Sequence, residues 1–295
     1  MDFKNAKELL ALCEERKLCI SDVMRRREIE EGETTGETCD ARMKKAYEIM
    51  RESARGPIKK PGRSMGGLLG GEAKMLSDWQ QGDGQGKSLC GPVLGRAVAY
   101  AMAVLETNAS MGLIVAAPTA GSSGIVPGVL LALEEQFHFA DAEMMQALYN
   151  AGAVGYLAMR NATVAGAVGG CQAEVGVASA MAASAAVELL GGSPKACLDA
   201  ASTVLMNLLG LVCDPVGGLV EYPCQNRNAA GVAVALTSAE MALAGVPQLI
   251  PLDEMIAVMY NVGRRIPAEL RETALGGCAT APSACEACGK GELQK

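Results

Sequence analysis

The sequence predicts an all-α protein with a single compact helical domain. Aromatic residues make up only 3% of its 295 residues, whereas it contains 35 glycines and 16 methionines. A β-sandwich core would need more Val, Ile, Tyr and Phe, and abundant small residues favour closely packed helices instead. No convincing stretch alternates between polar and apolar residues. The short apolar run Met111–Ala117 is the most strand-like exception.

Residues 1–63 form a charged N-terminal segment, which we assign to the same domain. They carry 15 Lys or Arg and 13 Asp or Glu, so mostly solvated helix is expected. A short helix is predicted over residues 5–18, and Cys39–Arg55 has apolar residues spaced for one helical face. From Gly56 to Gly91 the chain is broken and rich in glycine. This pattern fits either tight turns that approach a ligand or neighbour, or a flexible arm.

Residues 64–270 are expected to form the helical core. Proline in a first turn supports helix starts at Pro92 and Pro194, and Gly210 suits a helix stop. Helical periodicity extends over six ranges: Pro92–Glu106, Asp141–Arg160, Cys171–Leu190, Pro194–Leu209, 229–244 and 252–265. The irregular Gly/Pro stretches between these helices are the candidates for functional loops.

The segment Thr119–Gly128 is a Gly/Ser loop. It ends with a proline, Pro127, which suits the start of a following helix. Backbone N–H groups and hydroxyls at such an entrance can bind an anion such as a carboxylate. Gly121, Ser122, Ser123 and Gly124 are therefore candidate substrate-binding residues, and an ordinary turn and cap is the alternative. The loop is not a Walker motif, because no Gly-Lys-Ser/Thr follows.

An irregular segment, Gly210–Asn228, holds Cys213 and Cys224 among prolines and glycines. The prolines prevent a helix from running through, and the glycines permit positive φ or a close approach of the backbone. Such a segment can hold two thiolates at a metal centre; a connector that happens to carry two cysteines is the alternative. In the helix that Cys171 opens, Glu174 interrupts an apolar run, so it should have a specific partner or face a polar cavity.

Residues 271–295 form a cysteine-rich tail that contains Cys285-x-x-Cys288. A structural zinc site needs four ligands, usually in two such pairs, and the tail has one pair. A redox or loosely metal-binding tail and a disordered end therefore both stay open.

Charge and cysteine content exclude several classes of partner. The net charge of −7 argues against nucleic acid, because phosphates need a basic surface. Residues 107–133 carry no charge, but their glycines and prolines would leave backbone groups unsatisfied in lipid, which argues against a membrane protein.

The charged N-terminus lacks an apolar signal sequence, so we expect a cytoplasmic protein. Eleven cysteines then indicate reduced thiols, metal ligands or redox groups rather than disulfides.

Five motifs, in order, resemble the α subunit of the iron–sulfur-dependent L-serine dehydratases over nearly the whole chain. Any one motif alone would be weak, whereas five in order are specific. The motifs are Thr119-Ala-Gly-Ser-Ser-Gly-Ile-Val-Pro-Gly128, Gly170-Cys-Gln-Ala-Glu-Val-Gly176, Cys213-Asp-Pro-Val-Gly-Gly218, Pro223-Cys-Gln-Asn-Arg-Asn228 and Leu270-Arg-Glu-Thr-Ala-Leu-Gly-Gly277.

The resemblance implies a 4Fe–4S cluster held by Cys171, Cys213 and Cys224, with one iron open to substrate. That iron would act as a Lewis acid while L-serine is converted to pyruvate and ammonia. No pyridoxal phosphate is implied. The family also has a β subunit with histidine-containing motifs that this sequence lacks, so we expect a partner to complete the site and to supply the base. His138, the only histidine, is expected at the surface or in a helix cap.

Position suggests further site residues. Asn226, Arg227 and Asn228 follow a cluster ligand and can orient substrate or cluster sulfides, and Lys74 and Arg271 are additional candidates for substrate binding. A structural hydrogen bond is the alternative for each of them.

The tail and the reaction leave alternatives open. Cys285 or Cys288 is expected to approach the open iron or to help assemble or protect the cluster. Cysteine desulfidase chemistry would use the same cluster with thiolate leaving, although the chain length and the Gly-Ser-Ser-Gly-Ile loop favour serine. A non-enzymatic iron–sulfur sensor or assembly protein would not need an open iron.

Overall fold

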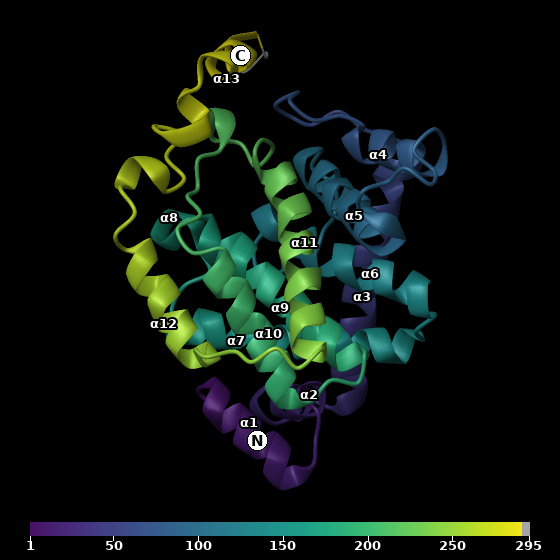
Figure 1. The fold of residues 1–295 in the computed structure, drawn as a ribbon, viewed down its shortest axis with the longest axis vertical. Helices are drawn as coiled ribbons and strands as arrows, with labels where there is room; N and C mark the ends of the chain where they lie inside the picture. Colours follow the sequence, from purple (N-terminus) through teal and green to yellow (C-terminus); the bar gives the residue numbers. More distant parts are fainter. Residues whose placement is uncertain (291–295) are drawn as a thin grey trace.

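The computed structural model describes residues 1–290 and places thirteen α-helices over them (Figure 1). Within this part of the chain there is no strand, and the only β-type pairing is an isolated bridge between Cys213 and Arg271. The predicted all-α, single-domain fold is therefore confirmed. The most strand-like run, Met111–Ala117, is a turn and irregular chain that pairs with no other described segment, so it does not disturb the all-α class.

The helix bounds match the sequence periodicity closely in the core. In chain order they are α1 (Ala6–Arg16), α2 (Ile20–Glu31), α3 (Gly36–Lys59), α4 (Glu72–Gln81), α5 (Gly91–Ala109), α6 (Ile125–Phe137), α7 (Asp141–Asn161), α8 (Gly166–Gly169), α9 (Val177–Leu189), α10 (Pro194–Asn207), α11 (Cys224–Leu243), α12 (Leu252–Gly263) and α13 (Pro282–Lys290).

Helix α9 lies at the centre of the molecule (Figure 1). Every residue from Val177 to Val187 is buried, and most of them are Ala, Ser or Val. A helix that is apolar all round belongs in the interior, and its small side chains let α6, α7, α10 and α11 pack against it. Gly155 on α7 allows one such approach, because a Cβ there would lie 3.1 Å from the sulfur of Met181.

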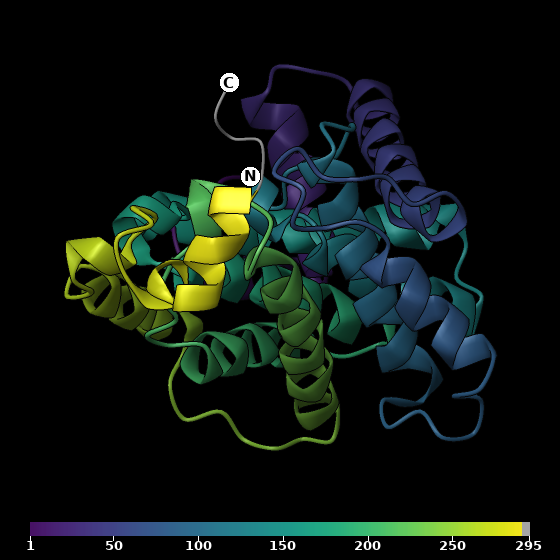
Figure 2. The same cartoon turned by 90° about the horizontal axis from the view of Figure 1, so that it is seen from above.

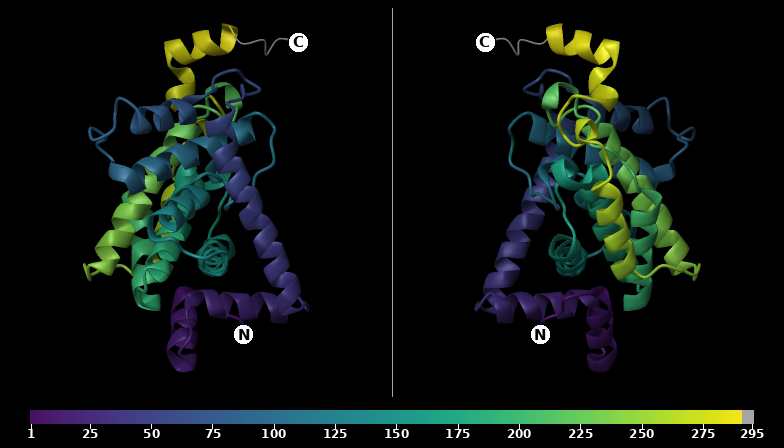
Figure 3. Two further views of the ribbon diagram at one scale, coloured as in Figure 1. Left: turned by 90° about the vertical axis from the view of Figure 1, so that its right-hand side faces the viewer. Right: turned by 90° about the vertical axis from the view of Figure 1, so that its left-hand side faces the viewer.

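The charged N-terminal segment folds as α1 and α2 at one end of the molecule and α3 along its side (Figure 3). Its helices are amphipathic rather than merely solvated, since Tyr47, Met50, Ala54 and Pro57 form one buried face of α3. The predicted break at Gly56 is wrong: α3 runs through Pro57 to Lys59. Burial of this face outweighs the backbone hydrogen bond that proline removes near the helix end.

The elements that carry the predicted ligands meet at the end of the molecule where α11 begins. A π-helical turn, η2 (Gln172–Gly176), leads into α9, and a 3-10 turn, η3 (Val216–Gly218), interrupts the loop between α10 and α11. Helix α13 packs against η3, as the view from above illustrates (Figure 2). Among the described residues, no helix is both long and apolar enough to cross a bilayer.

Candidate metal and substrate site

Cys171, Cys213 and Cys224 are buried and line one small cavity. They come from the turn before α9, the loop after α10 and the first residue of α11. The other residues that line the cavity are Gly121, Glu174, Val175, Pro215, Val220 and Glu272. The fold therefore brings together three cysteines that are widely separated in sequence.

The π turn before α9 is held from two sides by the buried side chain of Gln172. Its Nε2 donates to the carbonyl of Met259 at 2.8 Å, and its Oε1 accepts from the N–H of Gly210 at 2.9 Å. Single π turns occur frequently at functional sites because the extra residue redirects neighbouring side chains. In this protein the turn carries Glu174 and is preceded by Cys171.

Cys213 is held by the segment that leads into the tail. Its N–H donates to the carbonyl of Leu270 at 2.8 Å, and its own carbonyl accepts from the N–H of Glu272 at 2.6 Å. This pairing fixes the backbone of a ligand candidate and also brings Glu272 to the cavity.

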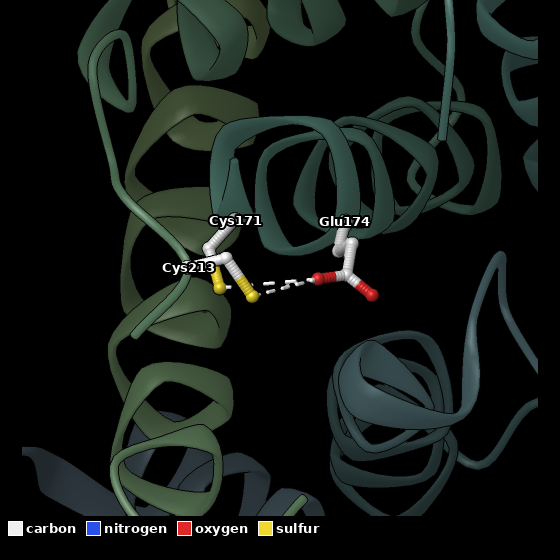
Figure 4. A group of neighbouring side chains, drawn as sticks. All are labelled: Cys171, Glu174 and Cys213. Atoms are coloured by element: carbon white, nitrogen blue, oxygen red, sulfur yellow. Dashed lines mark hydrogen bonds between the residues drawn. The ribbon is translucent and has the colours of Figure 1, made fainter. Parts of the chain in front are cut away.

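Glu174 comes from the same turn as Cys171 and faces both cysteines. Its Oε2 lies 3.6 Å from the Sγ of Cys213 and 3.9 Å from the Sγ of Cys171, and the three side chains point toward one another (Figure 4). The other oxygen accepts from the hydroxyl of Thr119 at 2.8 Å. The expectation that Glu174 has a specific partner and faces a polar cavity is thus confirmed. These two sulfurs and the carboxylate lie within 4.8 Å of one another and could hold a metal ion.

The protein environment opposes ionisation of these acids. Burial raises the pKa of Cys224 to about 12, and it also raises the pKa of the Glu174 carboxyl. A hydrogen bond with Cys171, together with burial, raises the pKa of the Cys213 thiol well above its ordinary range. Thiolates at these positions therefore need a compensating positive charge.

Arg227 supplies one such charge from α11. Its Nη1 donates to the carbonyl of Val212 at 2.9 Å and lies 3.6 Å from the Sγ of Cys171. The same atom forms an ion pair with the buried carboxylate of Asp214 at 2.6 Å. Asp214 also accepts from the N–H of Cys278 at 2.6 Å, so Arg227 and Asp214 join α11, the cysteine loop and the tail.

Asn228 connects the Gly/Ser turn to the helix that begins at Cys224. Its Oδ1 accepts from the N–H of Gly124 at 3.0 Å, and its Nδ2 donates to the carbonyl of Gly121 at 2.7 Å. Ser122 and Ser123 are fully buried, and the Ser123 hydroxyl donates to the carbonyl of Ala120 at 2.8 Å. Of the four predicted carboxylate-binding residues, Gly121 is the one that lines the cavity.

Several predicted residues lie elsewhere. The ammonium of Lys74 pairs with Asp78 on the outer side of α4, 2.7 Å away, and Asn226 is exposed on α11. Arg271 contributes its backbone to the bridge with Cys213. Lys74, Asn226 and Arg271 do not line the cysteine cavity. His138 is exposed and ends α6 in the left-handed conformation, with φ of 60°, as expected for a helix cap.

The tail lies against the cysteine loop from outside. Gly217 in η3 sits beside the sulfur of Cys288, because a Cβ at Gly217 would lie 3.0 Å from that atom. Cys285 is exposed, and its Sγ lies 3.7 Å from the carbonyl oxygen of Ala279. Neither cysteine lines the cavity, and tail residues 291–295 lie outside the described part of the chain.

Sequence reasoning missed two residues that shape this site. A Cβ at Gly166 would lie 2.3 Å from the Oε2 of Glu174 and 3.0 Å from the Sγ of Cys213, so a larger residue there would displace the Glu174 carboxylate. Glu221 is buried and accepts from the Ser64 hydroxyl and the Gly66 N–H, each at 2.6 Å. The available signals were the Gly-rich stretch before Cys171 and a second acid, besides Asp214, in the apolar loop that carries the cysteines.

Glu221 also decides between the two interpretations of the glycine-rich stretch. It accepts a third hydrogen bond, from the N–H of Leu68 at 3.0 Å, so residues 64–68 are bound to the cysteine loop. Helix α4 follows directly. Residues 64–68 are therefore held as tight turns against a neighbouring loop, as the first of the two interpretations predicts.

The family is established by comparison with known proteins. Residues 15–279 match the model of the family described as "Serine dehydratase alpha chain". The chain therefore belongs to the serine dehydratase alpha chain family.

Individual relatives agree over most of the chain. The probable L-serine dehydratase alpha chain of Bacillus subtilis is 45% identical over 284 residues, which cover 96% of this chain and 93% of the relative. The L-serine dehydratase alpha chain of Peptoniphilus asaccharolyticus is 44% identical, with 93% of each chain covered. The L-serine dehydratase TdcG of Escherichia coli is 36% identical over 300 residues, which cover 94% of this chain but 62% of TdcG.

Proposed function

We propose that this chain is the cluster-binding subunit of an L-serine dehydratase, which converts L-serine to pyruvate and ammonia. One observation carries the proposal: three buried cysteines from three separate elements line one cavity beside Glu174 and the Gly121 turn. Membership of the serine dehydratase alpha chain family and the names of the relatives support the choice of serine.

The donor set fits a 4Fe–4S cluster with three protein ligands, Cys171, Cys213 and Cys224. Thiolates are the usual ligands of such clusters, and no other cysteine among the described residues lines the cavity. The raised pKa values of Cys213 and Cys224 fit as well, because iron would supply the positive charge that their thiolates lack. When bound, the cluster would supply an iron without a protein ligand as a Lewis acid for departure of the serine hydroxyl.

The chain's own residues would bind and orient the substrate. The carboxylate of Glu174, oriented by Thr119, is a suitable acceptor for the substrate ammonium group. The Gly121 turn, which Asn228 holds rigidly against α11, would seat the substrate carboxylate through its backbone. Arg227, held by Asp214, would stabilise the Cys171 thiolate. Both ends of the amino acid would thus be fixed near the cysteines.

A separate β subunit would complete the site and supply the base that removes the Cα proton. The only histidine, His138, is exposed and does not line the cavity. Two relatives are named alpha chains. TdcG contains a further region that does not align with this chain. These facts support a partner of the kind that TdcG carries in one polypeptide.

The tail would regulate or protect the cluster through Cys285 or Cys288. The position of Cys288 against Gly217 supports this role, because Gly217 lies on the loop between two of the proposed ligands. Deletion of residues 284–295 should therefore change the lag before steady turnover or the cluster spectrum. An unchanged lag and spectrum would contradict a role for these cysteines.

The deciding experiment is anaerobic co-purification of this chain with its β partner. Brown protein with about four irons, a spectral change on addition of L-serine and formation of pyruvate would support the proposal. Colourless protein after anaerobic reconstitution with iron and sulfide would refute the cluster. Turnover of L-cysteine but not L-serine would instead support the desulfidase alternative.

A further inference from the structure

A second and larger cavity lies between α3, α4, α5 and α6. Its volume is about 680 Å³, which is within the range of small-molecule binding sites. The end of α3, the second half of α4, the glycine-rich loop 82–90 and the first turns of α5 form most of its wall. It shares no lining residue with the cysteine cavity, so the proposed reaction does not use it.

The lining of this cavity is positively charged, although the chain as a whole has a net charge of −7. Arg55, Lys59 and Arg96 line it, and Glu135 is the only acid among the lining residues. Glu135 binds Arg55 at 3.0 Å and lies 3.6 Å from Arg96, and Glu134, which does not line the cavity, lies 3.6 Å from Arg55. Lys59 forms no ion pair with any described residue. The cavity therefore has positive charge in excess of its internal partners.

Neutral donors add to this charge. Gly86, Ser88 and Gly91 line the cavity, and within the described chain their N–H groups donate to no protein acceptor. The side chains of Ser77 and Gln80 contribute further polar groups from α4. Phosphate oxygens accept hydrogen bonds from such combinations of backbone N–H groups and cationic side chains.

We propose that this cavity binds a phosphate ester of about nucleotide size. Its phosphate would interact with Lys59, Arg96 and the N–H groups of Gly86 and Ser88, and its body would lie on the apolar part of the wall around Ile58 and Tyr100. The cavity has room for a molecule far larger than serine or pyruvate. This proposal is independent of the proposed reaction, because it rests on a separate cavity.

The chain contains a built-in probe of this site. Trp79, the only tryptophan, lies on α4 next to the glycine-rich loop. Its carbonyl accepts from the N–H of Gly84 at 2.8 Å, and a Cβ at Gly84 would lie 2.5 Å from its indole ring. Gly84 lines the cavity, so a ligand that orders or displaces the loop changes the surroundings of the indole. Tryptophan emission therefore reports binding without any need for catalysis.

The test is a titration of the full, cluster-loaded chain under anaerobic conditions, followed by tryptophan emission and by calorimetry. The probes are adenosine 5′-monophosphate, glucose 6-phosphate, adenosine and inorganic phosphate. We expect saturable binding of at least one phosphate ester and much weaker binding of adenosine. The two esters distinguish a nucleotide from a sugar phosphate as the ligand.

Variants connect the binding to the cavity. Lys59→Gln and Arg96→Gln should each weaken binding of the ester at least about fivefold. Lys45→Gln is the matched control, because Lys45 is an exposed cation on the same helix, α3, and does not line the cavity. Lys59 forms no ion pair with a described residue, so K59Q tests binding even if R96Q is unstable. Three results would each overturn the proposal. Neither ester binds saturably, adenosine binds as tightly as the esters, or the affinity is unchanged in K59Q and R96Q.

Discussion

The carboxylate of Glu174 lies 3.6 Å from the sulfur of Cys213, although 39 positions separate the two residues. Gly166 makes this approach possible, since a Cβ there would collide with both groups. The contact places a carboxyl whose pKa is raised by burial next to two buried thiols and a threonine hydroxyl. Acids and thiols with raised pKa values that meet in one cavity are candidates for a functional site.

Replacement of any predicted ligand should abolish the cluster. In Cys171→Ser, Cys213→Ser and Cys224→Ser, we expect loss of most iron and acid-labile sulfide, because three thiolates are all that the cavity offers. Iron analysis and the visible spectrum measure this. Cys197→Ala is the matched control, since Cys197 is equally buried but lies on α10 away from the cavity. A full iron content in a ligand variant would remove that residue from the ligand set.

Glu174→Gln should keep the cluster but lose activity. Loss of one charged hydrogen bond to the substrate ammonium should reduce kcat/KM by about 10- to 100-fold. Serine titrations with the visible spectrum as a control for the cluster measure the effect. Glu272→Gln is the comparison variant: Glu272 also lines the cavity but is exposed, so its effect should be smaller. Wild-type kinetics in E174Q would refute a role for Glu174 in substrate binding.

Arg227→Lys should make the cluster more labile. A lysine cannot reproduce the contacts of the guanidinium with Val212, Asp214 and Cys171, and it leaves the buried Asp214 poorly paired. We expect the rate of absorbance loss in air to rise several-fold. Arg264→Lys, an exposed arginine on the turn after α12, is the control. Equal rates in both variants would show that Arg227 does not support the cluster.

Glu221→Ala should release the glycine-rich segment from the cysteine loop. The change leaves the Ser64 hydroxyl and the N–H groups of Gly66 and Leu68 without their acceptor, at a cost of about 2–4 kcal/mol in the free energy of unfolding. Hydrogen exchange at residues 64–70 should rise more than elsewhere. Glu240→Ala, on the exposed face of α11, is the control. Unchanged exchange in E221A would contradict this attachment.

Stability should depend on pH through Glu188, which accepts from Asn150 and from the backbone at Ile20. Burial raises the pKa of this carboxyl above its ordinary value of 4.5, although the hydrogen bonds oppose the rise. The native state therefore holds the proton more tightly than the unfolded state. The contribution of Glu188 to stability is thus greatest below pH 4.5 and is lost as the pH rises through the native pKa.

Urea unfolding at several pH values, for the parent and for Glu188→Gln, measures this contribution. The glutamine does not titrate, so the difference between the two proteins isolates Glu188 from other buried acids such as Glu106 and Glu174. The parent should lose stability relative to E188Q as the pH rises. A relative gain in stability with rising pH would show instead that the native fold lowers the pKa of Glu188.

Local sequence predicted the long core helices well, because their periodicity and caps are local properties. It failed at Pro57, where burial of one face of α3 outweighs a local break, and at α4, which forms within the glycine-rich stretch. In each case a tertiary contact decides what the local pattern leaves open.

The sequence by itself determined the all-α class, through its small and mostly non-aromatic residues, and the rigid Pro/Gly context of Cys213 and Cys224. Order and spacing of motifs also indicated the family, which the matches over residues 15–279 then established. Only the tertiary structure decided which side chains meet: Glu174 with Cys213, Glu221 with the loop at Ser64, and the cations around the second cavity. The physical reason is that such contacts join elements far apart in the chain, so they depend on how all the helices pack around α9.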